Sequence, residues 1–185
     1  MALPQITWQD VQQLPDDGHR HEAIEGELYV TPAPSFRHQR VSQKLEQELL
    51  RLLEAPGHGL VVHAPVGVEF PTTHEGVQPD IVFVSSARAH LISDEAIRGA
   101  PDLVVEILSP TTAHRDRGVK RKLYERQGVL EYWIVDMETE AVEVWSFGER
   151  PSEAPALQRY TDTLPVRLGT EWIGEIDLAG VFAAD

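Results

Sequence analysis

Hydrophobic and polar residues follow the period of a strand in some segments and that of a helix in others. The most informative change from strand to helix lies near the middle of the chain. Residues 102–108 are mainly β-branched and apolar, with a proline before and after, which predicts a buried strand. A basic helix is predicted directly after it, with Thr111 or Thr112 as its N-cap and Gly128 just past its C-terminus. This strand and this helix organise the expected fold.

Similar patterns predict the remaining elements. A long amphipathic helix is expected from Ser35 to about Leu53, because apolar residues recur at helical spacing on one face. Residues 20–30 alternate as a strand does, and Gly26 predicts either a bend or a tight hairpin within them. The other predicted strands are residues 60–70, 78–84, 130–135, 142–147, 157–160, 166–168 and 176–182, and the short helices are residues 7–14 and 93–97.

The order of strand, helix, strand and hairpin favours a mixed sheet in an α/β or α+β fold. With 185 residues and neither repeat nor linker, the chain is predicted to form one domain, residues 1–185. Cysteine is absent, which excludes disulfides and thiolate metal sites. No leader-peptide pattern and no apolar stretch of membrane-spanning length is present, so a cytoplasmic protein is expected.

The charge of the whole chain, −14, argues against a broad nucleic-acid surface, because proteins of that class usually carry a basic footprint. Basic residues are dense only between Arg115 and Arg126, in the predicted helix. Any contact with nucleic acid is therefore local, or this run is simply a solvated helix face.

The candidate chemistry begins with Glu106, a carboxylate inside an apolar strand, where burial is costly unless a cation, a metal or hydrogen bonds compensate it. Two Pro-Asp pairs offer a partner acid. Asp102 shares the strand of Glu106 but lies roughly 13 Å away at about 3.3 Å per residue, too far for one ion to join both. Asp80 begins another strand, and strand pairing can bring it opposite Glu106. Asp80 and Glu106 are the predicted pair, with a simple turn cap as the alternative for Asp80.

A lysine on the basic helix is expected to complete the site. Val119 and Leu123 define the buried side of that helix. At about 100° per residue, Lys120 lies about 60° from Leu123, nearer than Lys122 at about 100° and Arg121 at about 160°. Lys120 is therefore expected to turn inward, with a surface ion pair to Asp116 as the alternative.

Two carboxylates at neighbouring strand ends are typical of a Mg²⁺ or Mn²⁺ site, because these ions prefer oxygen ligands and keep several waters. Zinc is not expected, because of the eight histidines only His19 and His21 are close in sequence and no third ligand is evident. His38, at the inner end of the helix 35–53, either packs as a hydrogen-bonded histidine or contacts a phosphate or a site carboxylate.

Five separated motifs resemble the Uma-two family of restriction endonucleases and stand in the order of that family. They cover residues 22–136 and read EAIEGELY, HQRV, QPDIVFV, PDLVVEILSPTTAHRDRGVKRKLY and GVLEYWIVD. That family is similar to the PD-(D/E)xK nuclease superfamily. The resemblance therefore implies a restriction-endonuclease-like fold, a mixed central sheet flanked by helices, with two acids and a lysine at the edge of the sheet.

Carried over by position, the acid of the PD motif falls on Asp80 and the acid of E-x-K on Glu106. This chain has Leu108 where the superfamily usually has lysine. Family members resemble it in having a lysine four residues before the helix tyrosine, here Lys120, which is expected to restore the charge. Glu22 matches an acidic position of the family and is expected as a third acid bearing on the site.

The activity implied is hydrolysis of phosphodiester bonds by a Mg²⁺-dependent endodeoxyribonuclease. The expected catalytic residues are Asp80, Glu106, Lys120 and Glu22, the metal ligands Asp80, Glu106 and the carbonyl of Ile107, and the substrate-binding residues His38, Arg117 and Lys122. The expected partner is nucleic acid, as double-stranded DNA. Because cutting a duplex needs two sites, a homodimer is expected, with an exposed strand 130–135 or the hairpin after it as the contact.

Two other hypotheses stay open. Leu108 and the strong negative charge are consistent with an inactivated nuclease fold that binds nucleic acid or protein. A structural protein in which Glu106 and Lys120 form a buried ion pair is the third.

Overall fold

The computed structural model describes residues 5–148 and 154–184. Its helices are α1 (Trp8–Val11), α2 (Phe36–Leu49), α3 (Ala113–Arg115), α4 (Arg121–Gln127) and α5 (Leu178–Phe182), with π-helical turns at Leu50–Glu54 and Asp116–Lys120 and a 3-10 helix at Ser86–Leu91. Its strands are β1 (Arg20–Ile24), β2 (Glu27–Thr31), β3 (Gly59–His63), β4 (Val68–Phe70), β5 (Glu75–Val77), β6 (Ile81–Ser85), β7 (Ile97–Arg98), β8 (Leu103–Ile107), β9 (Glu131–Asp136), β10 (Ala141–Ser146), β11 (Ala156–Tyr160), β12 (Thr163–Leu168) and β13 (Glu171–Asp177). None of the helices in these residues is long and apolar enough to cross a membrane.

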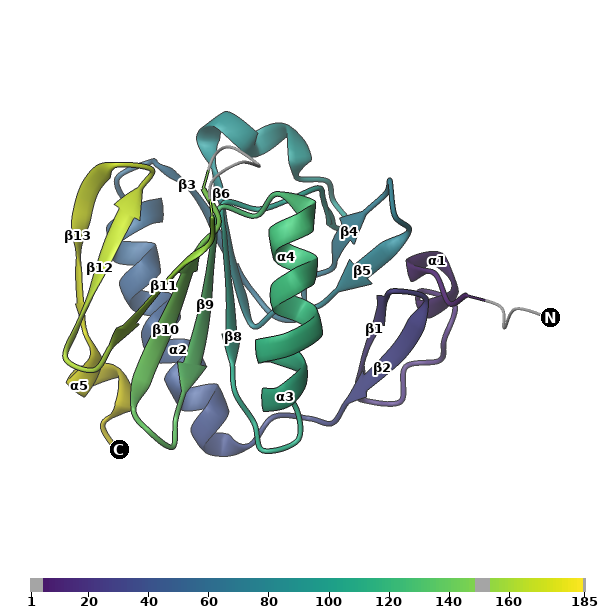
Figure 1. The fold of residues 1–185 in the computed structure, drawn as a ribbon, viewed down its shortest axis with the longest axis horizontal. Coiled ribbons are helices and arrows are strands. Elements are labelled where there is room, and N and C mark those ends of the chain that lie inside the picture. Colours follow the sequence, from purple (N-terminus) through teal and green to yellow (C-terminus); the bar gives the residue numbers. More distant parts are fainter. Residues whose placement is uncertain (1–4, 149–153, 185) are drawn as a thin grey trace.

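A mixed sheet of six strands forms the centre, in the order β11-β10-β9-β8-β6-β3. Strands β8 and β9 are parallel, and the other neighbouring strands of this sheet are antiparallel. A parallel pair needs a crossover, and the helix formed by α3, the π-helical turn and α4 provides it (Figure 1). The predicted mixed sheet and the predicted basic helix are therefore confirmed.

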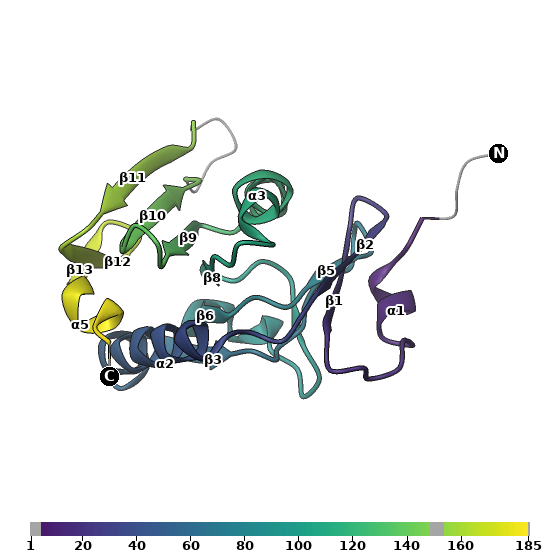
Figure 2. The ribbon, with the colours of Figure 1, turned by 90° about the horizontal axis from the view of Figure 1, so that it is seen from below.

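Helices cover both faces of the central sheet, as Figure 2 shows, with α2 on one side and the crossover helix on the other. The side chains of β8 alternate accordingly: Val105 packs in the core cluster with α2, and Val104 packs in the cluster that includes Leu123 of α4. Glu106 shares the face of Val104. The alternation of a single strand thus directs one carboxylate toward the basic helix.

A second sheet, in the order β2-β1-β5-β4-β7, lies to one side of the first, beyond the crossover helix (Figure 1). Its β1 and β2 form a tight hairpin in which Glu25 and Gly26 both have positive φ, at 53° and 78°. Glycine tolerates that geometry and permits the two-residue turn. The hairpin predicted at Gly26 is confirmed, and it places β1 beside the central sheet.

The strand predicted at residues 60–70 is wrong. The chain forms β3 in the central sheet, leaves it through Pro65 and Gly67, and forms β4 in the second sheet. Proline cannot donate to a strand ladder and glycine weakens one, so the apolar run breaks there into two strands.

Two further elements differ from the expectation. The helix predicted at residues 93–97 is a turn, in which the Ser93 hydroxyl accepts from the Ala96 N–H at 3.1 Å and Ile97 pairs with Val68. The strand predicted at 176–182 ends at Asp177, whose side chain accepts from the Ala179 N–H at 3.1 Å and caps α5. In both places a hydrogen bond from the backbone to a short polar side chain, rather than the apolar pattern, determines the backbone conformation.

Strand β9 is not an exposed contact surface. It lies between β8 and β10, and the four residues from Tyr132 to Val135 are fully buried. A continuous apolar run is typical of a strand covered on both faces. The proposal of a dimer contact through residues 130–135 is therefore wrong.

Candidate functional site

The candidate site forms where β6 begins and β8 ends. The antiparallel register pairs Ile81 with Val105, so Asp80 lies one step further on, beside Glu106. The backbone N–H of Ile107 donates to Asp80 Oδ2 at 2.7 Å. The two acids predicted as a pair are thus brought to the same end of neighbouring strands, both of them buried.

Glu106 meets the crossover helix. Its Oε1 accepts from Lys120 Nζ at 2.7 Å and from the Tyr124 hydroxyl at 2.7 Å. Burial raises the pKa of Glu106 to about 7, because the nearby charge of Lys120 is offset by the neighbouring acids Asp116, Asp80 and Glu22. The carboxylate therefore stands in an environment that favours an additional positive charge.

Lys120 turns fully inward, as its position on the helical wheel predicted, and the alternative of a surface ion pair is wrong. Its amine lies 2.8 Å from Glu22 Oε1 and 3.9 Å from Asp116 Oδ1. Burial alone would lower the pKa of Lys120, but Glu106, Glu22 and Asp116 raise it above its ordinary value. Lys120 is therefore a charged donor at neutral pH.

Glu22 reaches this amine from β1, in the second sheet. Its Oε1 also accepts from the backbone N–H of Gln78 at 2.9 Å, which fixes the carboxylate beside the chain segment that leads to Asp80. Arg115 Nη2 lies 3.6 Å from Glu22 Oε2 and donates to Thr31 at 2.5 Å. The third acid expected from the sequence is therefore part of the cluster.

Asp80 is held by two basic side chains. Arg20 Nη1 donates to its Oδ1 at 2.7 Å, and His38 Nε2 lies 3.3 Å from its Oδ2 and 3.1 Å from the carbonyl oxygen of Ile107. Burial would raise the pKa of Asp80, but His38, Arg20 and the Ile107 N–H lower it to about 2. Both alternatives for His38 are observed, because it packs as a buried, hydrogen-bonded histidine and also contacts a site carboxylate.

The cluster is closed toward solvent. The side chains of Glu22, Asp80, Glu106 and Lys120 are each at most 4% exposed, whereas Arg20 is 21% and Arg115 12% exposed. Two guanidinium groups therefore lie at its outer boundary, and a solute reaches the acids only if this boundary opens.

Two expected substrate-binding residues lie elsewhere on the crossover helix. Arg117 is exposed and pairs with Asp136 at 2.9 Å and with Glu143 at 2.7 Å, on β9 and β10. Lys122 is also exposed. Neither is brought to Glu106. Leu108 is buried and belongs to the same apolar cluster as Leu123, so it contributes packing where the superfamily usually has a charge.

Arg20 is a residue of this cluster that the sequence analysis did not single out. On an extended strand, Arg20 and Glu22 share one face, and that alternation was a usable signal. Tyr124 follows Lys120 by four residues and so lies on the same side of the helix. Its hydrogen bond to Glu106 depends on the docking of the helix, which has no local signature.

The residues present fit a Mg²⁺ or Mn²⁺ ion in the chemistry of their donors. Asp80, Glu106 and the carbonyl of Ile107 are oxygen ligands, and Mg²⁺ is commonly held by one or two carboxylates plus waters. Buried oxygens of Glu22 and Asp116 have no hydrogen-bond partner in the described part of the chain. In that same part, no three His, Cys, Asp or Glu side chains already form a metal-binding group. An ion would therefore bind through rearranged side chains and waters.

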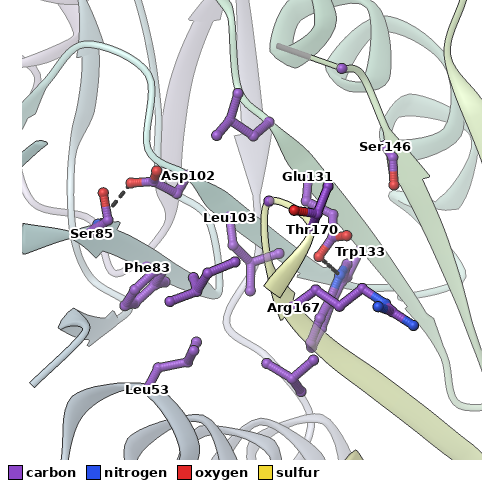
Figure 3. A pocket seen from close by; sticks show the side chains of 15 residues that line it. Leu53, Phe83, Ser85, Asp102, Leu103, Glu131, Trp133, Ser146, Arg167 and Thr170 are labelled. Atoms are coloured by element: carbon purple, nitrogen blue, oxygen red, sulfur yellow. Dashed lines mark hydrogen bonds between the residues drawn. The ribbon is translucent and has the colours of Figure 1, made fainter. Parts of the chain in front are cut away.

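A cavity lies at the other end of the same strands (Figure 3). It measures about 670 Å³, and its lining includes Ser85, Asp102, Glu131, Trp133 and Arg167. Figure 3 shows Trp133 donating to Glu131 and Ser85 donating to Asp102. None of the residues predicted for the site lines this cavity, so cavity size does not locate the chemistry here.

A mixed sheet flanked by helices, with two acids at the ends of adjacent strands and a lysine from the crossover helix, is of the restriction-endonuclease-like class. Residues 8–179 match the profile of the Uma2 family, described as "Putative restriction endonuclease". The chain belongs to this family.

Two individual proteins are similar to this chain. An uncharacterized protein from Synechocystis sp. is 27% identical over 130 residues, which cover 70% of this chain and 64% of that protein's length. A crystal structure described as "a putative nuclease belonging to DUF820", from Anabaena variabilis, superposes with a TM-score of 0.73. It is 20% identical, the match covers 96% of this chain and 97% of that one, and it shows the shared fold.

Proposed function

We propose that this chain is a divalent-metal-dependent endonuclease that hydrolyses phosphodiester bonds in double-stranded DNA, in the cytoplasm and as a homodimer. The observation that carries the proposal is the meeting of Asp80 and Glu106 across β6 and β8, with the Lys120 amine 2.7 Å from Glu106. Three segments far apart in the chain thereby bring two acids and an amine to one end of a sheet.

Each residue has a distinct task in this mechanism. Asp80, Glu106 and the Ile107 carbonyl would hold the ion, which when bound polarises the phosphate and lowers the pKa of a water. Lys120 keeps its proton, because three carboxylates raise its pKa, so it stabilises negative charge rather than acting as a base. Glu22 holds the amine of Lys120 in place at 2.8 Å.

The test is cleavage of supercoiled plasmid by the purified protein with Mg²⁺ or Mn²⁺. Nicked and linear products should form with the ion and vanish with a chelator. Asp80→Asn and Glu106→Gln should each reduce the rate at least about 100-fold, since each removes an ion ligand. Asp94→Asn, at an exposed aspartate outside the site, is the matched control and should leave the rate unchanged. Metal-dependent cutting that persists in both site variants would contradict the proposal.

A second candidate function is a binding module with an inactivated nuclease fold. It is favoured by Leu108 in place of the usual lysine and by an Asp80 whose oxygens are all held by protein donors. This candidate predicts that the protein binds DNA equally with and without the ion and leaves the plasmid intact.

A further inference from the structure

Asp80 uses both of its oxygens on donors of the same chain. Arg20 Nη1 donates to Oδ1 at 2.7 Å, and the Ile107 N–H donates to Oδ2 at 2.7 Å, with His38 Nε2 3.3 Å from the same oxygen. The Asp80 side chain is 4% exposed. A cation that binds Oδ1 therefore competes with the Arg20 guanidinium for this oxygen.

Of these donors, Arg20 is the least fixed by the central sheet, although its Nη1 also donates to the Gln78 carbonyl at 3.2 Å. The Ile107 N–H is part of the β8 backbone, and His38 is buried against the Ile107 carbonyl at 3.1 Å. Arg20 instead comes from β1 of the second sheet and is 21% exposed. Its Nε–H is buried without an acceptor among the residues described, so its present position leaves one donor unsatisfied.

The guanidinium interacts with the same acids that would surround an ion. Burial tends to lower the pKa of Arg20, but Asp80, Glu106 and Glu22 together raise it above its usual value. These three carboxylates belong to the proposed site. The same three carboxylates therefore attract both a divalent ion and the Arg20 guanidinium, and the ion carries twice the positive charge.

We propose that Arg20 is an internal competitor of the divalent cation at Asp80: it neutralises this acid in the ion-free chain and leaves it when the ion binds. The inference rests on the proposed function, because it takes the ion to bind at Asp80. The apparent affinity for the ion is then the intrinsic affinity reduced by the fraction of chains in which Arg20 is displaced. Arg20 thereby sets the cation concentration at which the site fills.

The test is calorimetric titration with Mn²⁺ in the absence of nucleic acid. Arg20→Gln removes the charge but keeps a hydrogen-bond donor, and it should bind Mn²⁺ about tenfold or more tightly than the natural chain. Arg20→Lys keeps a cation and should stay within about threefold of the natural chain. The matched control is Arg37→Gln, at an arginine 56% exposed and paired with Glu140, which should leave the affinity unchanged.

The outcomes separate the inference from the function on which it rests. Equal or weaker Mn²⁺ binding by Arg20→Gln, with binding retained by the natural chain, overturns the competitor role and leaves the metal site standing. Absence of Mn²⁺ binding in both proteins overturns both claims.

A second measurement follows the natural chain itself, and a variant serves only to assign the signal. The side-chain NMR signal of Arg20, assigned by its absence in Arg20→Lys, should move to the position of a solvated arginine as Mg²⁺ is added. An unchanged signal at saturating Mg²⁺ would overturn the inference.

Discussion

Lys120 brings a buried positive charge from the crossover helix to Glu106 on β8. A buried ammonium needs acceptors on several sides, and Glu106, Glu22 and Asp116 surround this one at 2.7, 2.8 and 3.9 Å. The strand position carries Leu108, whose side chain packs in the apolar cluster instead. In this chain the charge therefore comes from the helix, while the strand position contributes packing.

Replacing Lys120 by methionine separates its charge from its volume. We expect the cleavage rate of Lys120→Met to fall about 10²–10³-fold, the usual loss when a buried donor to developing charge is removed. Mn²⁺ binding should persist, because Asp80 and Glu106 remain. The measurement is single-turnover cleavage beside a Mn²⁺ titration, with Lys44→Met, on α2, as control. Natural turnover in Lys120→Met would remove this residue from the mechanism.

The acid stability of the ion-free protein should report on Asp80. Its pKa is about 2 in the fold against 3.8 for a free side chain, so the folded state binds fewer protons than the unfolded state between these values. The contribution of Asp80 is therefore complete above pH 3.8 and lost as the pH falls through 2. It amounts to at most about 2 kcal/mol at 1.36 kcal/mol per pKa unit.

Urea denaturation of the natural chain and of Asp80→Asn from pH 5 to 2 measures this contribution. The difference in free energy of unfolding should shrink as the pH falls. A difference that stays constant over the range would show that Asp80 is not preferentially ionised in the fold.

Residues of the site could be predicted where a charged side chain does not fit the apolar pattern of its own strand or helix. Glu106 is an acid in an apolar strand, and Lys120 lies beside the apolar stripe of its helix, so both could be singled out. Arg20 raised no such conflict, since arginine is ordinary on an edge of a sheet. Its partner Asp80 is 60 residues away. Sequence patterns identify unusual residues, whereas their partners depend on how the sheets meet.

The crossover helix is the element that carries the amine, and its end points were well marked in the sequence. Gly128 adopts the left-handed conformation, with φ 86°, directly after Gln127. The middle of the helix contains one π-helical turn, Asp116–Lys120, which has no clear sequence signal. Such turns are frequent at functional sites, and this one contains both Asp116 and Lys120.

Two glycines of this helix should respond to alanine in opposite ways. A Cβ at either Gly118 or Gly128 would meet no atom within 4 Å, so only backbone conformation matters. Gly128→Ala should lower the free energy of unfolding by about 1 kcal/mol, because alanine is strained at positive φ. Gly118→Ala should raise it by about 0.5–1 kcal/mol, because alanine is the better helix former. Thermal or urea denaturation measures both, and changes of the same sign would contradict the described helix.

Strands were harder to predict than helices for a physical reason. The strand pattern in 60–70 is locally sound, yet its two halves pair with partners in different sheets. Likewise, the apolar segment 176–182 becomes helical after Asp177, where a side chain caps the turn. The local pattern predicts that a strand exists. Its stabilisation comes from neighbours distant in the chain, so its boundaries and the sheet it joins cannot be predicted from that pattern.

At the scale of the whole molecule, the net negative charge and the burial of the site acids limit how DNA can approach these acids. A chain of net charge −14 repels a polyanion, and the acids of the site lie behind Arg20 and Arg115. Binding of a divalent ion would lower the negative charge at that position. On the proposed account, ion binding and the opening of the guanidinium boundary precede contact with a phosphate.

The most direct test of the central claim, that Asp80 and Glu106 belong to one metal site, is anomalous diffraction from crystals soaked in Mn²⁺. We expect one strong peak between these two carboxylates and the Ile107 carbonyl, with Arg20 turned away from Asp80. The peak should be absent in crystals of Asp80→Asn. Full Mn²⁺ occupancy at another position, with the Arg20–Asp80 contact intact, would contradict the account.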